Sequence, residues 1–269
     1  TVTFIQDHYP SVKLFAEQEN LGFGQGNNKG ISYALKQGAE HVFLLNQDAY
    51  LIDDCLEQLI NVQEKNPDYG ILSPIHTNAT VTRLDRNFSI YVRFDRNPDF
   101  YSDYVLGNKL DEVYEVPFIN AAGWLISKEC LMTVGGFDPI FFHYGEDRNY
   151  AQRVLYHGLK IGVVSNTLLI HDRENRKKDQ IEKWTDKYFQ ELEKNLKVKL
   201  ADVNEKSSLV ELKKSIQSKR KTRLKLQLKG RFKHAGNIKK VIQLFDQIKP
   251  QIKKSVEINK KKQPNYLNL

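Results

Sequence analysis

Two acidic segments of the sequence lie where a carboxylate could bind a cation or line a pocket. The first is Asn46-Gln47-Asp48, which follows directly on an apolar run. A carboxylate there could bind Mg²⁺ or Mn²⁺ against a diphosphate, because these hard cations prefer oxygen ligands and keep several waters, so that one or two protein carboxylates suffice. An aspartate at this position could equally cap a helix or form a turn, and the segment by itself supports both interpretations.

The second acidic segment is Glu146-Asp147, which follows a run of aromatic residues at 141–144 and enters a helical pattern. Acidic residues at a helix start stabilise the helix dipole, which is the simpler interpretation of the pair taken alone. The aromatic residues before it favour an enclosed pocket instead. A further candidate, His171, ends another apolar run, where its imidazole could bind a metal or merely cap a strand.

A glycine-rich stretch from Glu19 to Gly30 opens a helical pattern. Glycines let the backbone approach a ligand closely, and a helix N-terminus offers free N–H groups to a phosphate. The glycine spacing fits neither the dinucleotide-binding fingerprint nor a P-loop. A plain turn between a strand and a helix is therefore an equally good interpretation of this stretch alone.

The elements that would position these residues form an α/β pattern between Lys13 and about His171. The apolar run 41–45 predicts a buried strand, and Asp53 or Asp54 then caps a helix that runs to about Glu64. Because open α/β sheets bind ligands at the C-terminal ends of their strands, Asp48 is expected at a site. Further predicted elements are strands at 70–75, 89–94 and 159–170, an extended segment at 113–126, a loop at 95–108 that could cover a substrate, and a short helix that Ser127 caps and Gly135-Gly136 ends.

After about Asp172 the pattern changes to long, charged helical stretches at 181–196 and 209–228. We therefore predict an α/β domain over residues 1–172 and a basic helical region over 173–269. Residues 201–269 contain 19 Lys or Arg and 5 Asp or Glu, whereas residues 1–200 contain 22 and 28. The basicity lies in the tail, which indicates an anionic partner there. Residues after Lys260-Lys261-Lys262, the last ten or so, are expected to be mobile.

The composition, with 40% hydrophobic and 11% aromatic residues, is that of a soluble globular protein. No apolar run approaches the roughly 20 residues that span a bilayer, and the first segment lacks the pattern of a secretory signal. These features predict a cytoplasmic chain that does not cross a membrane. Cys55 and Cys130 fall in amphipathic helical patterns and are expected to be buried, reduced thiols.

Taken together and in this order, the segments resemble the family 2 glycosyltransferases of the GT-A fold, especially bacterial enzymes of surface polysaccharide synthesis, including rhamnosyltransferase-like members. The resemblance covers roughly residues 10–172 and is most specific at 19–30, 44–48 and 135–147. It implies a mixed sheet flanked by helices that binds a nucleotide-sugar. Each segment alone is ambiguous, whereas the ordered set is specific.

The resemblance also implies roles for individual residues. Asp48 matches the last aspartate of the family's metal-binding Asp-X-Asp motif, although Asn46 replaces the first aspartate and leaves fewer charges for Mg²⁺ or Mn²⁺. Asp147 matches the catalytic base, with Glu146 as its neighbour and acceptor-binding partner, and His171 is similar to a histidine that contacts the metal in many members. The residues that would contact the donor are Asn20, Gly22, Asn28, Gly30 and Asn46.

The implied reaction is inverting transfer of a hexosyl group from a UDP-, dTDP- or GDP-linked donor to a saccharide or polyprenyl-linked acceptor. Family members begin with a strand, a helix and a second strand whose final aspartate contacts the nucleotide base, and this sequence starts after that point. We therefore expect about two strands fewer than in the family, with an exposed sheet edge and an incomplete nucleotide pocket.

Other classes of function fit parts of the sequence. The basic tail could attach the chain to anionic lipid on the inner face of the cytoplasmic membrane, or form a solvated helical bundle. Residues 219–231 could instead contact nucleic acid, although no recognised reading motif accompanies them. A non-catalytic sugar- or partner-binding relative is the third alternative, which the presence of both Asp48 and Asp147 disfavours.

Overall fold

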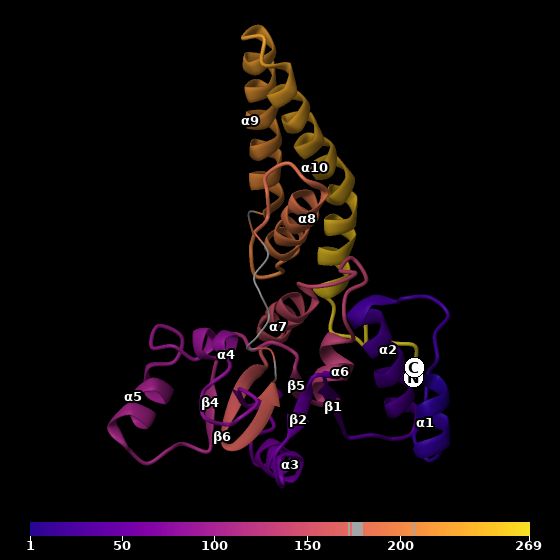
Figure 1. The fold of residues 1–269 in the computed structure, drawn as a ribbon, viewed down its shortest axis with the longest axis vertical. Coiled ribbons are helices and arrows are strands. Elements are labelled where there is room, and N and C mark those ends of the chain that lie inside the picture. The colour runs from indigo at the N-terminus through magenta and orange to yellow at the C-terminus, as the bar shows by residue number, and fades with distance from the viewer. Residues whose placement is uncertain (172, 174–179, 207) are drawn as a thin grey trace.

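The structure is a computed structural model that describes residues 1–171, 173, 180–206 and 208–269. Its centre is one mixed sheet in the order β1-β5-β3-β6-β2, with β4 also paired to β6 (Figure 1). Strands β3 and β6 are parallel, and the other pairings are antiparallel. The strands are β1 (His41–Leu45), β2 (Ala49–Leu51), β3 (Tyr69–Thr77), β4 (Val113–Glu115), β5 (Gly123–Ser127) and β6 (Lys160–His171).

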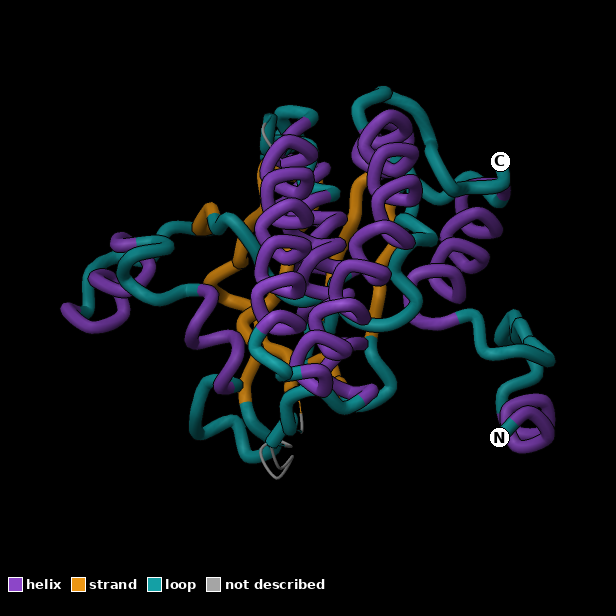
Figure 2. Tube along the Cα trace, turned by 90° about the horizontal axis from the view of Figure 1, so that it is seen from above, coloured by secondary structure: helices purple, strands orange, loops and turns teal. Residues whose placement is uncertain are grey.

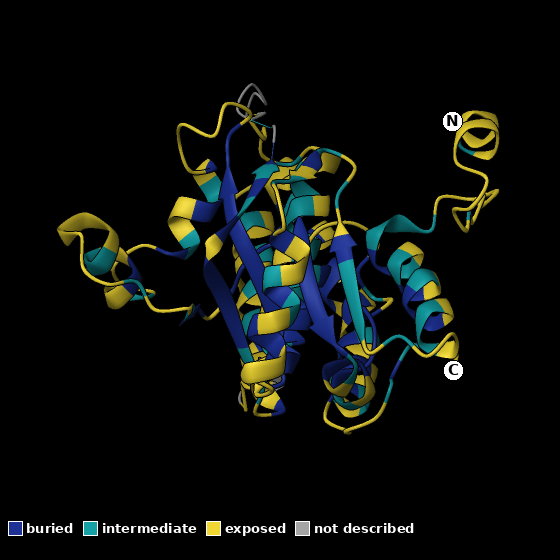
Figure 3. Cartoon of the chain, turned by 90° about the horizontal axis from the view of Figure 1, so that it is seen from below, coloured by how far each residue is buried: buried dark blue, intermediate teal, exposed yellow. Residues whose placement is uncertain are grey.

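Alternate residues of the strands point to opposite faces of the sheet, as the two-residue period of a strand requires. Trp124 and Ile126 join one apolar cluster, whereas Leu125 between them joins another. The first cluster contains side chains of α2 (Gly22–Lys36), α6 (Lys128–Val134) and α7 (Glu146–Tyr156), and the second contains side chains of α3 (Cys55–Lys65). The buried strands thus lie between helices (Figure 3).

Two short helices stand where the sequence predicted a strand at 89–94 and a loop at 95–108. They are α4 (Arg86–Tyr91) and α5 (Pro98–Leu106), and α5 forms an arm beside the sheet (Figure 1). Asp85 caps α4 by accepting hydrogen bonds from the N–H groups of residues 87 and 88, and Asn97 caps α5 with Pro98 in its first turn. These caps stabilise helices too short for a clear apolar period, so the prediction for both segments was wrong.

The C-terminal region is helical, as predicted. Helices α9 (Ser208–Leu228) and α10 (Phe232–Asn259) form a long hairpin that rises away from the sheet, with α8 (Asp186–Leu200) at its base (Figure 1). Seen down the hairpin, these helices lie over the strands, and α1 (Val2–His8) stands apart at the start of the chain (Figure 2). Within the described ranges, no helix has both the length and the apolar composition that a bilayer crossing requires.

The last residues of the chain return to the α/β unit, so the prediction that they are mobile was wrong. The backbone N–H of Gly136 donates to the carbonyl of Asn265 (2.8 Å), and the N–H of Asn268 donates to Ser32 Oγ (3.0 Å). Leu267 packs against the main apolar cluster of the sheet. The polar composition of this segment does not predict its docking, because backbone groups make most of its contacts with the α/β unit.

Asp138 joins the helical region to the sheet. Its buried carboxylate accepts hydrogen bonds from Ser255 (2.6 Å) and Asn259 (2.7 Å) of α10 and from the Tyr266 hydroxyl (3.2 Å), as well as from the N–H of Ile140 (3.0 Å). One aspartate from the Gly135-Gly136-Phe137-Asp138 segment therefore holds both α10 and the tail. These contacts cross the predicted boundary at residue 172.

Candidate active site

A cavity of about 680 Å³ opens where β1 and β6 end and α7 begins. Strands β1, β3 and β6 run in one direction, so their C-terminal ends meet at the same edge of the sheet. Five of the residues predicted to form a site line this one cavity: Asn46, Asp48, Glu146, Asp147 and His171. Residues more than 100 positions apart in the sequence are thereby brought together.

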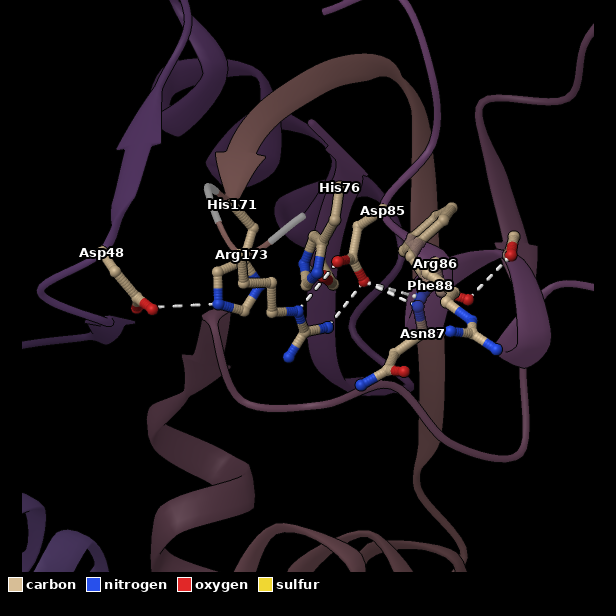
Figure 4. A network of polar contacts seen from close by, with 10 residues as sticks. Asp48, His76, Asp85, Arg86, Asn87, Phe88, His171 and Arg173 are labelled. Atoms are coloured by element: carbon tan, nitrogen blue, oxygen red, sulfur yellow. Dashed lines mark hydrogen bonds and ion pairs between the residues drawn. The ribbon is translucent and has the colours of Figure 1, made fainter. Parts of the chain in front are cut away.

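Asp48 and His171 come together through the pairing of β2 with β6. Ala49 is paired with His171, which places Asp48 beside the imidazole, and Asp48 Oδ1 lies 3.6 Å from His171 Nε2 (Figure 4). An oxygen and a nitrogen at this separation could both reach one divalent cation, since neighbouring ligands at about 2.1 Å from a Mg²⁺ ion are roughly 3 Å apart. In the part of the chain that the structure describes, no group of three His, Cys, Asp or Glu side chains is placed to hold a metal. Waters and a diphosphate would have to supply the remaining ligands.

A polar network lies beside His171, on the side away from Asp48 (Figure 4). Arg173 donates two hydrogen bonds to Asp85 (2.8 and 2.6 Å). Burial opposes ionisation of Asp85, but the bonds from Arg173 and from the Phe88 N–H hold the pKa of its carboxyl below the ordinary value. The network ties the segment after β6 to the first turn of α4.

His76 packs edge-on against His171, with ring centroids 5.9 Å apart. Burial, and then the neighbouring His171, lower the pKa of His76 to about 3, so this ring is neutral at pH 7. Its Nε2 lies 3.0 Å from Ser73 Oγ. A neutral, fully buried ring fixes the orientation of His171 without adding charge to the cavity.

Glu146 and Asp147 begin α7, directly after Gly145, whose φ of +95° turns the chain into the helix. Glu146 is 5% exposed, and burial followed by the charge of Asp147 raises the pKa of its carboxyl to about 7. Burial also raises the pKa of Asp147, which is half-buried and accepts a hydrogen bond from the N–H of Arg148 (2.7 Å). Raised pKa values in a cavity are typical of carboxyls that exchange protons.

Comparison with known proteins shows which family the chain belongs to. A family model described as "Glycosyl transferase family group 2" matches residues 41–248, most of the chain. The chain belongs to this family of glycosyltransferases. The predicted family is thereby confirmed, and the structure confirms the predicted class, a mixed α/β sheet flanked by helices and followed by a helical region.

One curated relative of this family 2 glycosyltransferase chain is the dTDP-rhamnosyl transferase RfbF of Shigella flexneri, which is 24% identical over 169 residues. That match covers 60% of the chain and 52% of the relative, so the chain spans about half the length of the relative. Among solved structures, the crystal structure of GalNAc-T7 with UDP, GalNAc and Mn²⁺ superimposes with a TM-score of 0.48 at 12% identity, over 74% of this chain and 41% of that one.

Four residues that the resemblance assigned to the donor do not line the cavity of this glycosyltransferase chain: Asn20, Gly22, Asn28 and Gly30. The buried carboxamide of Asn28 instead binds the backbone of Phe137 in both directions (2.7 and 2.8 Å). Gly22, with a φ of +73°, lies so close to the Phe142 carbonyl that a Cβ would be 2.0 Å from its oxygen. The glycine-rich stretch therefore supports the loop before Glu146-Asp147, and only its residues Phe23 and Asn27 reach the cavity.

Other residues of the lining were missed from the sequence, notably Asn120, Tyr91 and Arg173. Asn120 follows the apolar run 116–119 as Asn46 follows 41–45, and this signal could have identified it. Arg173 comes two residues after His171 at the end of β6 and could have been found in the same way. Tyr91 could not, because its helix was predicted as a strand.

Proposed function

We propose that this chain transfers a sugar from a nucleoside-diphosphate donor to a hydroxyl group of an acceptor, with inversion at the anomeric carbon. The observation that supports it best is the meeting of Asp147 and Glu146 with Asp48 and His171 in one cavity. Within the described residues, two buried acceptor atoms of the lining, Asn120 Oδ1 and Glu146 Oε2, have no hydrogen-bond partner. Such atoms in a cavity are suited to accept hydrogen bonds from the hydroxyl groups of a sugar.

Asp147 acts as the general base in this proposal. It removes the proton of the acceptor hydroxyl while that oxygen attacks the anomeric carbon, and the bond to the diphosphate oxygen breaks on the opposite face. One displacement inverts the centre, and the proton stays on Asp147 until it passes to solvent. Glu146 accepts a hydrogen bond from another acceptor hydroxyl.

Asp48 and His171 would hold the divalent cation, Mg²⁺ or Mn²⁺, and the 3.6 Å between their ligand atoms is compatible with this. When bound, such a cation neutralises charge on the leaving diphosphate. Asn46 adds a neutral amide oxygen where the family has a carboxylate. The site would therefore depend on the donor's phosphates for much of its affinity.

The donor we favour is a dTDP-linked hexose, with UDP- and GDP-linked sugars as the alternatives, because the curated relative is named a dTDP-rhamnosyl transferase. The acceptor would be a saccharide or a polyprenyl-linked saccharide of a bacterial surface polysaccharide. Such acceptors place the reaction at the inner face of the cytoplasmic membrane. The basic helical region supports this location through attraction to anionic lipid.

Calorimetric titration of the chain with UDP, dTDP and GDP, each with and without Mn²⁺, tests the donor site. We expect one nucleotide to bind only with Mn²⁺, and this binding to be lost in Asp48→Ala. The matched control is Asp68→Ala, which removes an exposed carboxylate outside the cavity lining. Equal binding in EDTA and in Asp48→Ala would refute the metal site, and no binding of any nucleotide would refute the proposed function for this chain.

A further inference from the structure

The turn between α9 and α10 lies at the far end of the hairpin (Figure 1). Large apolar side chains around this turn are exposed. Leu228 is 80% exposed and Phe232 is 69% exposed, and Gly230 between them turns the chain with a φ of +66°. Leu224, one helical turn before Leu228, is also exposed. We call residues 224–233 the hairpin tip. Leu224, Leu228 and Phe232 are too exposed to contribute to the packing of α9 against α10.

The hairpin tip lies in the most basic part of the chain. Residues 213–245 contain twelve Lys or Arg and no Asp or Glu. Four of these cations directly flank the apolar side chains of the tip and are exposed: Lys225, Lys229, Arg231 and Lys233. The one ion pair described for residues 213–245 joins Arg220, one helical turn before the tip, to Asp246. The local charge therefore excludes another copy of the same surface as a partner.

We propose that the hairpin tip docks on the surface of an anionic phospholipid bilayer. Leu228 and Phe232 enter the boundary between headgroups and acyl chains, and the flanking cations contact lipid phosphates. This inference rests on the membrane location proposed above and names the part of the chain that makes the contact. The exposed apolar side chains suit the acyl-chain boundary of such a surface, and the cations suit its anionic headgroups.

The hairpin approaches the bilayer end-on. At 100° per residue, the Lys and Arg residues at 213, 214, 219, 220, 221, 223 and 225 cover about two thirds of the circumference of α9. A helix that lies flat in the interface needs an apolar face along its length, and α9 has none. The apolar side chains gather at the tip instead. The 28 residues of α10 correspond to about 42 Å, so the hairpin holds the sheet at up to that distance from the lipid.

Nucleic acid would satisfy the cations but not the apolar side chains. Phosphate contacts come from Lys and Arg, and binding to single strands adds aromatic stacking, to which Leu228 contributes nothing. Substitution of the apolar residues alone thus distinguishes the two partners. Lipid binding should need them, whereas binding to a nucleic acid should not.

Co-sedimentation of the full chain with vesicles tests the proposal. The vesicles contain phosphatidylcholine alone or with phosphatidylglycerol, and the double variant is Leu228→Ser with Phe232→Ser. The matched control is Val105→Ser with Leu106→Ser on α5, where the two side chains are 65% and 72% exposed outside any basic cluster. We expect the wild type and the α5 control to bind the anionic vesicles alike, and the tip variant to bind at least about tenfold more weakly, which corresponds to about 1.4 kcal/mol.

A charge variant, Lys229→Gln with Arg231→Gln, should also weaken binding about tenfold and reduce its dependence on salt. Unchanged thermal unfolding would show that these exposed substitutions leave the fold intact. Equal binding of the tip variant and the wild type would overturn the assignment to the tip while leaving the membrane location standing. A wild type that binds a nucleic acid but neither kind of vesicle would overturn both, and the nucleotide titrations above would still test sugar transfer separately.

Discussion

Glu146 and Asp147 are adjacent in sequence but differ in exposure. Glu146, the first residue of α7, is buried, whereas Asp147 is half-buried in the cavity wall. The carboxyl that reaches the cavity more freely is the better placed to meet a substrate hydroxyl. The ionisation of the buried carboxyl, Glu146, makes the free energy of unfolding depend on pH. These two properties can be measured separately.

We expect Asp147→Asn to lower turnover by about 10²–10⁴-fold, the usual contribution of a positioned general base. The amide has nearly the same shape but cannot accept the proton, so nucleotide binding should change little. Turnover is measured as the release of nucleoside diphosphate from the donor. Nucleotide binding is measured by calorimetry on the same preparation. Turnover within a few-fold of the wild type would show that Asp147 is not the base.

Glu146→Gln tests the effect of burial on ionisation. Because burial raises the folded-state pKa of Glu146 from its ordinary 4.5 to about 7, the folded chain binds this proton more tightly than the unfolded chain. The wild type therefore loses stability from this group as pH rises between those values. The neutral variant escapes that loss, so its free energy of unfolding relative to wild type should increase by about 2–3 kcal/mol between pH 4 and pH 8.

Urea unfolding at the two pH values measures that difference. The control is Glu129→Gln, which neutralises an exposed carboxyl in the first turn of α6. A difference between Glu146→Gln and wild type that is the same at both pH values would mean that Glu146 ionises in the folded chain as it does in water.

At the scale of the elements, Asp138 connects α10 and the tail to the loop that leads toward α7. Asp138→Ala would leave the buried partners Ser255 and Asn259 without their acceptor, and each buried unsatisfied group costs about 1–3 kcal/mol. We expect the free energy of unfolding to fall by roughly 2–4 kcal/mol in urea titrations. Asp246→Ala, which removes an exposed carboxylate from the same helix, should change it by less than about 1 kcal/mol.

Elements with a clear period or an apolar run were predictable from the sequence. Strands β1, β3 and β6 were predicted close to their observed bounds, and polar residues at the ends of β1 and β6 identified Asp48 and His171. Helix α4 was not predictable in this way, because a six-residue helix shows too little of its period and is specified by the cap at Asp85. The network of His76, Asp85 and Arg173 depends on tertiary contacts that no local pattern encodes.

At the scale of the whole molecule, the docked tail can be tested with two glycines that have the same positive φ. Gly135 and Gly158 both have a φ of +84°, but a Cβ on Gly135 would lie 2.2 Å from the carbonyl oxygen of Asn265, whereas one on Gly158 would meet no atom within 4 Å. Alanine costs about 1–2 kcal/mol at a positive φ, and it costs more at Gly135, whose ψ of −157° lies in a region that essentially only glycine populates. Displacement of the tail should add about 1–3 kcal/mol for Gly135→Ala alone.

Urea unfolding of both variants, together with carboxypeptidase digestion, checks this. We expect Gly135→Ala to lose more stability than Gly158→Ala and to release its C-terminal residues faster. Equal losses, with digestion at the wild-type rate in both, would contradict the docking of residues 263–268 on the α/β unit.

The returning tail also matters during synthesis of the chain. The last strand, β6, is complete at His171, but Leu267, which covers part of the sheet's apolar cluster, is translated almost 100 residues later. At typical rates of about 5–20 residues per second, that interval lasts roughly 5–20 s. During this time the nascent sheet exposes the part of its apolar surface that Leu267 covers in the folded chain, so its cotranslational folding waits for a segment made almost 100 residues after the sheet itself.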